Sequence, residues 1–177
     1  MNNFPTVRLS FYLLNTMVVL SACNEPKAHA GDKKIYSALE YNSFLVDQQN
    51  KITTGLINLT ASIDSLPGEK IESAYRDLLS KSDTAFLNVT MLSPFDADSV
   101  YLIQARNLIR FYRNVFRKEY KAMIEIYLKQ EFATEKDLAH LRILVDTINK
   151  QESLHDALFR MEMQRFSEKY QLEFSNN

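Results

Sequence analysis

Five basic residues at helical spacing are the first feature of this sequence that could do binding chemistry. They step by four, three, four and four residues, so at about 100° per residue they share a sector roughly 80° wide on one helix. Arginine forks gathered on one face can bind phosphate, sulfate or carboxylate groups of a ligand, a glycan or a lipid head group. The alternative is a solvated or salt-bridged face. The basic row consists of Arg106, Arg110, Arg113, Arg117 and Lys121.

A second pattern places an acid three residues before a histidine. Glu152 and His155 have this spacing, and Asp137 and His140 repeat it on the same predicted helix. The pattern resembles the metal-ligand motif of ferritin-like di-iron bundles, which take such motifs from two different helices and add glutamates from the others. Here both copies share one helix, and the remaining histidine, His29, lies near the N-terminus. We therefore expect no metal and no cofactor, with Glu152 and His155 as the candidates should a metal bind.

The single cysteine, Cys23, follows a short apolar run and indicates where the protein resides. The apolar residues 9–20 are far fewer than the roughly 20 that a membrane-spanning helix needs. Leu20-Ser21-Ala22-Cys23 resembles the bacterial lipobox. The resemblance implies that residues 1–22 are a signal peptide, that the Cys23 sulfur receives a diacylglyceryl group, and that the new amino terminus is acylated, for example with palmitate. The alternative is a plain secretory signal, with Cys23 lost or left as a free thiol.

A lipidated Cys23 predicts a protein held at the bacterial cell envelope. Two or more acyl chains bind a membrane firmly, and we expect the outer membrane, on its periplasmic or surface face. Residues 23–33 lack apolar periodicity and are expected to form a tether. The 155 residues from Cys23 onward suffice for one domain. Their 20 basic and 22 acidic residues give a net charge near −2, which does not favour nucleic acid as a partner.

The rest of the chain contains few helix breakers and predicts long helices. Gly55 lies inside the first, where glycine costs about 1 kcal/mol relative to alanine, so it indicates a close helix contact. Capping signals at Ser93-Pro94-Phe95-Asp96 and at Thr134–Asp137 predict two helix starts. Short loops between long helices predict an all-α, antiparallel up-down four-helix bundle over residues 34–177. Its helices are expected at about 34–66, 69–90, 95–130 and 135–171.

The third predicted helix carries the widest apolar stripe, which is typical of a helix that faces two neighbours. Its core positions recur every seven residues along the helix. One series is Tyr101, Leu108, Val115 and Ala122, a second is Leu102, Ile109, Phe116 and Met123, and a third contains Ala105, Tyr112 and Ile126.

No pattern in the sequence favours catalysis, because it contains no Gly-rich phosphate loop and no nucleophile elbow. The stretch 41–49 resembles uncharacterised helical surface lipoproteins, a resemblance that implies no activity. We expect a non-enzymatic, membrane-anchored interaction or structural module whose partner is an unknown protein or glycan. The alternative is a bundle that binds a small ligand, an anion or a metal, with its site between helices around Arg110 or His155.

Overall fold

The structure is a computed structural model that describes residues 37–65, 68–129 and 132–172. Within these ranges the regular structure is helical, apart from one isolated bridge between Phe95 and Asp98. The predicted all-α fold is confirmed. The signal peptide, Cys23, the tether and the expected helix start at residue 34 lie outside the described residues. The helices are α1 (Ala38–Ser65), α2 (Gly68–Met91), α3 (Val100–Val115), the π-helix η1 (Phe116–Tyr120), α4 (Lys121–Leu128) and α5 (Glu135–Lys169).

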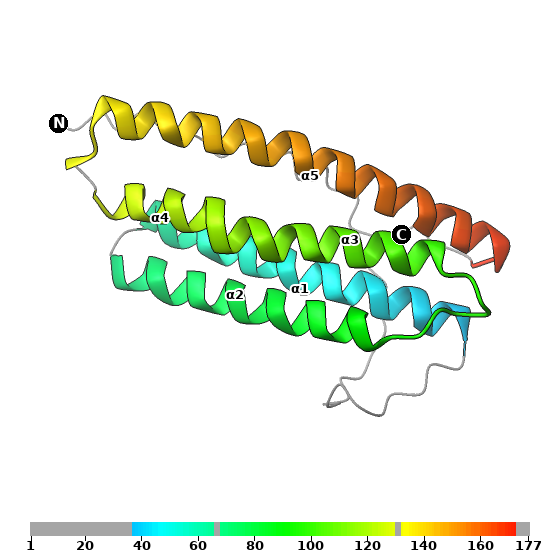
Figure 1. Cartoon of the computed structure of the whole chain (residues 1–177). Coiled ribbons are helices and arrows are strands. Elements are labelled where there is room, and N and C mark those ends of the chain that lie inside the picture. Colours follow the sequence, from blue (N-terminus) through cyan, green and yellow to red (C-terminus); the bar gives the residue numbers. More distant parts are fainter. Residues whose placement is uncertain (1–36, 66–67, 130–131, 173–177) are drawn as a thin grey trace.

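The helices pack as a bundle of four long rods, in which α3, η1 and α4 follow one another along a single rod (Figure 1). α1 packs mainly on α2, α2 also packs on α3, and α3 packs mainly on α5. The rings of Tyr41 and Tyr101 lie 5.6 and 5.1 Å from that of Phe166, so the starts of α1 and α3 meet the end of α5. α1 and α3 therefore start at the end of the bundle where α5 finishes. α5 follows α3 closely and diverges from α4 toward its own first residues, which are yellow in Figure 1.

Local capping sets the starts of the first and last helices. Before α1, the Ser37 backbone N–H donates to Glu40 Oε2 (3.2 Å) and the Glu40 N–H donates to Ser37 Oγ (3.1 Å). Before α5, the capping box expected at Thr134 and Asp137 is confirmed, with backbone N–H to side-chain oxygen distances of 2.9 and 3.2 Å. These reciprocal bonds satisfy donors that the first helical turn leaves without partners.

The third rod begins at Val100 rather than near Phe95, so the helix start expected from Ser93-Pro94-Phe95-Asp96 is wrong. Asp96 and Ala97 have φ angles of 48° and 57°, in the left-handed region that an α-helix cannot include. The turn directs the Phe95 ring toward Tyr41, with centroids 5.4 Å apart. Aromatic packing at the end of the bundle therefore overrides the local helix-start signal.

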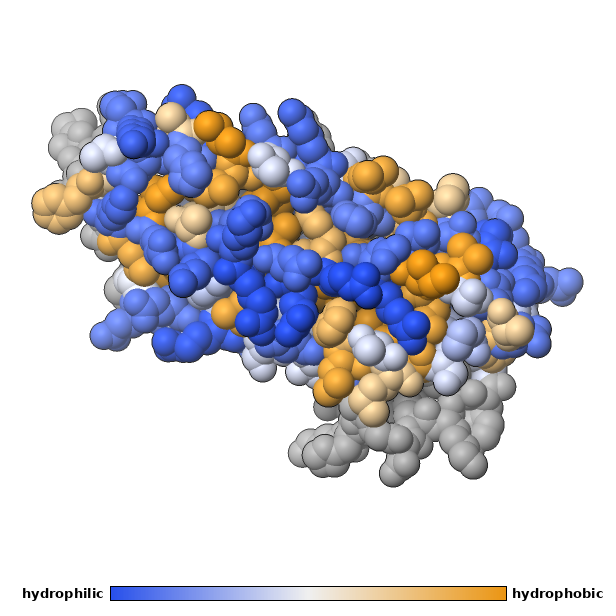
Figure 2. Space-filling model, in the orientation of Figure 1, coloured by the Kyte–Doolittle hydropathy of each residue, from blue (hydrophilic) through white to orange (hydrophobic). Residues whose placement is uncertain are grey.

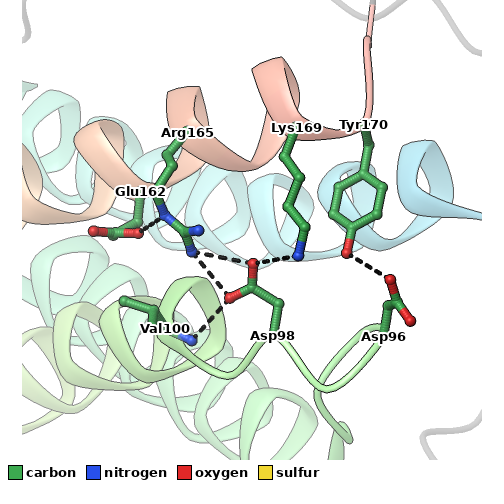
Figure 3. Close-up of polar contacts among 7 residues, drawn as sticks. All are labelled: Asp96, Asp98, Val100, Glu162, Arg165, Lys169 and Tyr170. Atoms are coloured by element: carbon green, nitrogen blue, oxygen red, sulfur yellow. Dashed lines mark hydrogen bonds and ion pairs between the residues drawn. The ribbon is translucent and has the colours of Figure 1, made fainter.

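Side chains of the same loop are tied to the end of α5 (Figure 3). Asp98 accepts hydrogen bonds from Arg165 Nη2 (2.9 and 3.2 Å), from Lys169 Nζ (3.2 Å) and from the Val100 backbone N–H (3.3 Å). We call Asp98, Arg165 and Lys169 the Asp98 clasp. Because Asp98 stands just before α3 and the two cations lie in the last turns of α5, the clasp joins α3 to α5 at this end of the bundle.

Gly55 makes the close helix contact that the sequence predicts. A Cβ atom at this position would lie 2.9 Å from Leu78 Cδ1 and 3.4 Å from Leu78 Cα. A side chain here would require Leu78 to move and would crowd the α2 backbone, which explains why glycine, a residue that weakens an isolated helix, is present where α1 packs on α2.

Candidate functional site

Three arginines of the basic row form hydrogen bonds or ion pairs with α2. Arg106 donates from Nε to the carbonyl oxygen of Val89 (2.8 Å) and from Nη2 to those of Thr90 (3.0 Å) and Leu92 (2.7 Å). The last carbonyl groups of a helix have no partners within it, so this guanidinium caps the C-terminal end of α2. Arg106 therefore has a structural role.

Arg113 and Arg117 share one carboxylate on α2. Arg113 Nε lies 2.7 Å from Asp83 Oδ1, and Arg117 Nη2 lies 2.8 and 2.6 Å from its two oxygens. Desolvation acts to raise the pKa of Asp83, but hydrogen bonds from Arg117 and then Arg113 outweigh it and hold that pKa below its ordinary value. The Arg113 guanidinium also lies 4.8 Å from the centre of the Phe86 ring. For Arg113 and Arg117, the alternative of a salt-bridged face is therefore correct, and the acid that pairs with them is Asp83.

Arg110 and Lys121 differ from the other three members of the row. Both side chains are exposed, and neither makes a hydrogen bond or an ion pair with another described residue. Arg110 lies on the side of α3 that is turned toward α5, and it lines an open groove there. The basic row is therefore divided. Three of its arginines stabilise the contact with α2, and Arg110 is available for binding.

The α3–α5 groove has a volume of about 380 Å³ and a mixed lining, to which polar and apolar surface contribute about equally. α3 contributes its outer edge, η1 contributes two charged residues, and α5 contributes the opposite wall. In Figure 2, strongly hydrophilic side chains (dark blue) gather over the middle of the face that is in view. The groove is lined by Asn107, Arg110, Phe111, Asn114, Val115, Lys118, Glu119, Gln151 and His155.

The π-helix η1 supplies Lys118 and Glu119 to the groove. Glu119 follows Tyr112 by seven residues, so an uninterrupted α-helix would direct it to the same core face as Tyr112. The wider turn of η1 instead leaves Glu119 at the groove, with 18% of its side chain exposed and its Oε1 3.4 Å from Lys118 Nζ, while Tyr120 enters the core. Single π-turns within α-helices often occur at functional sites.

The sequence reading missed this π-turn, although a signal for it was present. The third heptad series of the core contains Ala105, Tyr112 and Ile126, and its remaining member is the acid Glu119. A carboxylate at a position of this series would have no partner in an apolar core, which is a reason to expect an irregular turn. The predicted helix over 95–130 is therefore one rod but not one regular α-helix.

Glu152 and His155 lie in different surroundings although they are one turn apart. The His155 ring stacks on Phe111, with centroids 4.8 Å apart, and burial lowers its pKa, so the ring is neutral at pH 7. Glu152 is turned further inward and accepts a hydrogen bond from Tyr112 Oη (2.9 Å). Burial raises the pKa of Glu152, against the lowering effect of that bond. Across the described ranges, no group of three or more His, Cys, Asp and Glu side chains is placed to hold a metal ion.

The structure brings together the two residues around which the sequence analysis placed an alternative site. Arg110 from α3 and His155 from α5 line the same groove. Glu152 does not line it, and Arg106, Arg113 and Arg117 are engaged with α2. The predicted lipidation site, Cys23, lies outside the described residues, and none of the helices in the described ranges has the length and apolar character needed to cross a bilayer.

Searches against models of known protein families, curated protein sequences and solved structures found no match to this chain.

Proposed function

We propose that this protein is a lipid-anchored, non-enzymatic module of the bacterial cell envelope that holds an anionic partner in the α3–α5 groove. The anchor rests on the lipobox-like Leu20-Ser21-Ala22-Cys23 motif. The binding role rests on the groove. A short tether before a rigid bundle would keep the groove near the membrane while leaving it open to a protein or a glycan.

The observation that carries the binding role is the guanidinium of Arg110, which has no hydrogen-bond or ion-pair partner among the described residues. A paired arginine must lose its partner before it can bind a ligand, as Arg113 and Arg117 would have to lose Asp83. Arg110 has no described partner to lose and is exposed on the groove wall. An anion that binds it gains charge-assisted hydrogen bonds at little cost to the fold.

Binding accounts for the groove better than catalysis does. His155 is the one histidine of the groove, and its ring packs on Phe111 without a hydrogen bond or ion pair to another described residue. A catalytic base is ordinarily oriented by a third group and lies within hydrogen-bond reach of a nucleophile. The acid of the groove, Glu119, is paired with Lys118. These arrangements suit a surface that recognises a ligand.

Charge reversal in the groove tests the binding role. The full-length protein, with a photo-reactive residue in place of Asn114, is expected to form a crosslinked species in intact cells. Arg110→Glu should abolish this species. Arg142→Glu makes the same charge change at an exposed position of α5 outside the groove and should leave it intact. Crosslinking that is equal in both variants would contradict the proposed binding role.

A separate experiment tests the anchor. Cys23→Ser should move the protein from the membrane fraction to the soluble fraction, and the lipid-dependent increase in the mass of the mature N-terminal peptide should disappear. An unchanged membrane fraction would show that the protein is held in another way. Because the groove and the anchor are far apart in the sequence, each experiment can fail without the other.

A further inference from the structure

The chemistry of the α3–α5 groove narrows the class of anion that fits it. We propose that the groove binds a carboxylate-bearing sugar residue, such as a hexuronic acid of a glycan. This inference rests on the proposed function and specifies the ligand of the same site.

The charge balance of the groove favours a ligand with a single negative charge. Arg110 and Lys118 are cationic, Glu119 is anionic, and His155 is neutral because burial lowers its pKa. The groove therefore carries a net charge of about +1 at pH 7. Glu119 would repel any anion in the groove, and it would repel a phosphate dianion about twice as strongly as a carboxylate at the same distance. The groove lies along the middle of helices, where backbone N–H groups are already bonded, so it lacks the helix N-terminus that often binds phosphate.

The geometry of Arg110 suits a carboxylate in particular. A guanidinium presents two parallel N–H groups that match the two oxygens of a carboxylate. Arg110 is exposed and unpaired among the described residues, so both N–H groups can point at a ligand. A carboxylate at this position would also lie on the same wall as Lys118, whose side chain is 86% exposed but whose Nζ lies 3.4 Å from Glu119 Oε1, so Lys118 would have to leave that ion pair to contact the ligand.

The remaining polar groups of the groove are matched to hydroxyl groups. An amide side chain both donates and accepts hydrogen bonds, as a sugar hydroxyl does. Three amide side chains line the groove. One of them, Asn107, donates a weak hydrogen bond from Nδ2 to Gln104 Oε1 (3.4 Å). The neutral His155 ring adds one donor and one acceptor, and the Glu119 carboxylate adds acceptors. The three amides are those of Asn107, Asn114 and Gln151.

An acidic peptide fits the groove less well than a sugar acid. Peptides gain much of their affinity by placing apolar side chains in pockets. The two apolar residues of this groove, Phe111 and Val115, are only 7% and 5% exposed, so little of either side chain is available for a peptide side chain to contact. A volume of about 380 Å³ accommodates one or two sugar rings and falls within the usual range for ligand sites.

The test is titration calorimetry on the full-length protein in detergent, with four probes. These are methyl glucuronide, methyl glucoside, glucose 6-phosphate and a capped Glu-Glu dipeptide. We expect the uronide to bind at least tenfold more tightly than each of the other three. Arg110→Gln should weaken uronide binding at least tenfold, while Arg142→Gln should leave it unchanged. Unchanged circular dichroism and melting temperature would show that both variants fold.

Neutralising the acid of the groove tests the charge argument independently. Glu119→Gln raises the net charge of the groove and should improve binding of glucose 6-phosphate relative to methyl glucuronide by at least threefold. Side-chain amide NMR signals of Asn107, Asn114 and Gln151 should shift with the uronide and return to their free positions in the Arg110→Gln variant.

The outcomes separate this inference from the proposed function. If the dipeptide or the phosphate ester binds best and requires Arg110, the proposed anionic partner stands and the sugar acid is wrong. If the glucoside binds as well as the uronide, the carboxylate has no role and the inference is overturned. If no probe binds, the inference is also overturned, and the crosslinking experiment in cells then decides whether the groove binds any partner.

Discussion

Removing the carboxylate of the Asp98 clasp should destabilise the whole bundle. The Asp98 side chain is 6% exposed and accepts hydrogen bonds from Arg165, Lys169 and the Val100 backbone N–H. The clasp joins the residue before α3 to the last turns of α5, so it closes the bundle between segments distant in sequence. Asp98→Ala removes all of these bonds in one change.

The expected loss is about 2–3 kcal/mol of unfolding free energy. A hydrogen bond to a charged group contributes about 1.5–3 kcal/mol when it is buried, whereas an exposed ion pair contributes about 0–1 kcal/mol. The side chains of Arg165 and Lys169 are 44% and 45% exposed, so water replaces part of what they lose. Asp98→Asn retains an acceptor for Val100 and should lose about 1–2 kcal/mol.

Urea unfolding of the Cys23→Ser protein, followed by circular dichroism, measures this loss. With a slope of about 2 kcal/mol per molar urea, the midpoint of Asp98→Ala should fall by about 1–1.5 M. Asp146→Ala, at an exposed position of α5, is the matched control and should change stability by less than about 0.5 kcal/mol.

The pH dependence of this loss follows from the pKa of Asp98. Hydrogen bonding from Arg165, followed by that from Lys169, lowers the pKa of Asp98 in the folded protein, against partial desolvation. The carboxylate therefore stabilises the fold above its unfolded pKa of about 4, and this contribution is lost as pH falls through the lower folded pKa. The difference between wild type and Asp98→Ala should shrink at acid pH. A loss below about 0.5 kcal/mol at pH 7, or no coupling to Arg165→Met in a double-mutant cycle, would refute the reasoning.

Three further changes probe the bundle and the inward face of α5. Gly55→Leu should cost more than about 2 kcal/mol in urea unfolding, because the new side chain meets α2 at Leu78; equal stability would show that the helices can separate there. Asp83→Ala should lower the thermal midpoint by several degrees, since two arginines lose their acid, whereas Arg110→Ala should leave it within about one degree. Glu152→Gln should be neutral or stabilising at pH 7. Burial raises the pKa of Glu152, so the wild-type carboxyl costs stability as pH rises from its unfolded value of about 4.3 to its folded pKa; a variant that loses stability as pH rises, relative to wild type, would contradict this sign.

Helix positions could be predicted because their signals are local. The capping box at Thr134 and Asp137 works within one turn and starts α5 where expected. The spacing of apolar residues reports which face of a helix is inward, and it also indicated the helix contact at Gly55. Neither inference requires knowledge of distant residues, because helix caps and the 3.6-residue period depend on near neighbours in the chain.

The failures arose where distant residues outweigh local preference. Ser93-Pro94-Phe95-Asp96 is a good helix start in isolation, but Phe95 packs on Tyr41 and Asp98 binds Arg165, and both partners come from other helices. The π-helix η1 similarly depends on distant residues, because its wider turn places the Glu119 carboxylate at the groove and the Tyr120 ring in the core that the other helices form. Local sequence signals assign both segments to regular helix, because these signals do not include the distant residues that the segments contact.

The sequence by itself determined the all-α bundle, the start of its last helix and the presence of five basic residues on one helix face, because helical periodicity and capping are encoded by residues a turn or two apart. Only the tertiary structure decided what that face does. The basic row covers a sector of α3 about 80° wide, which is wide enough to face both α2 and α5. Because of where these two helices lie, Arg106, Arg113 and Arg117 bind α2, while Arg110 lines the same groove as His155 of α5. Which charge is paired and which is available depends on contacts between helices, and those contacts form only when the bundle packs.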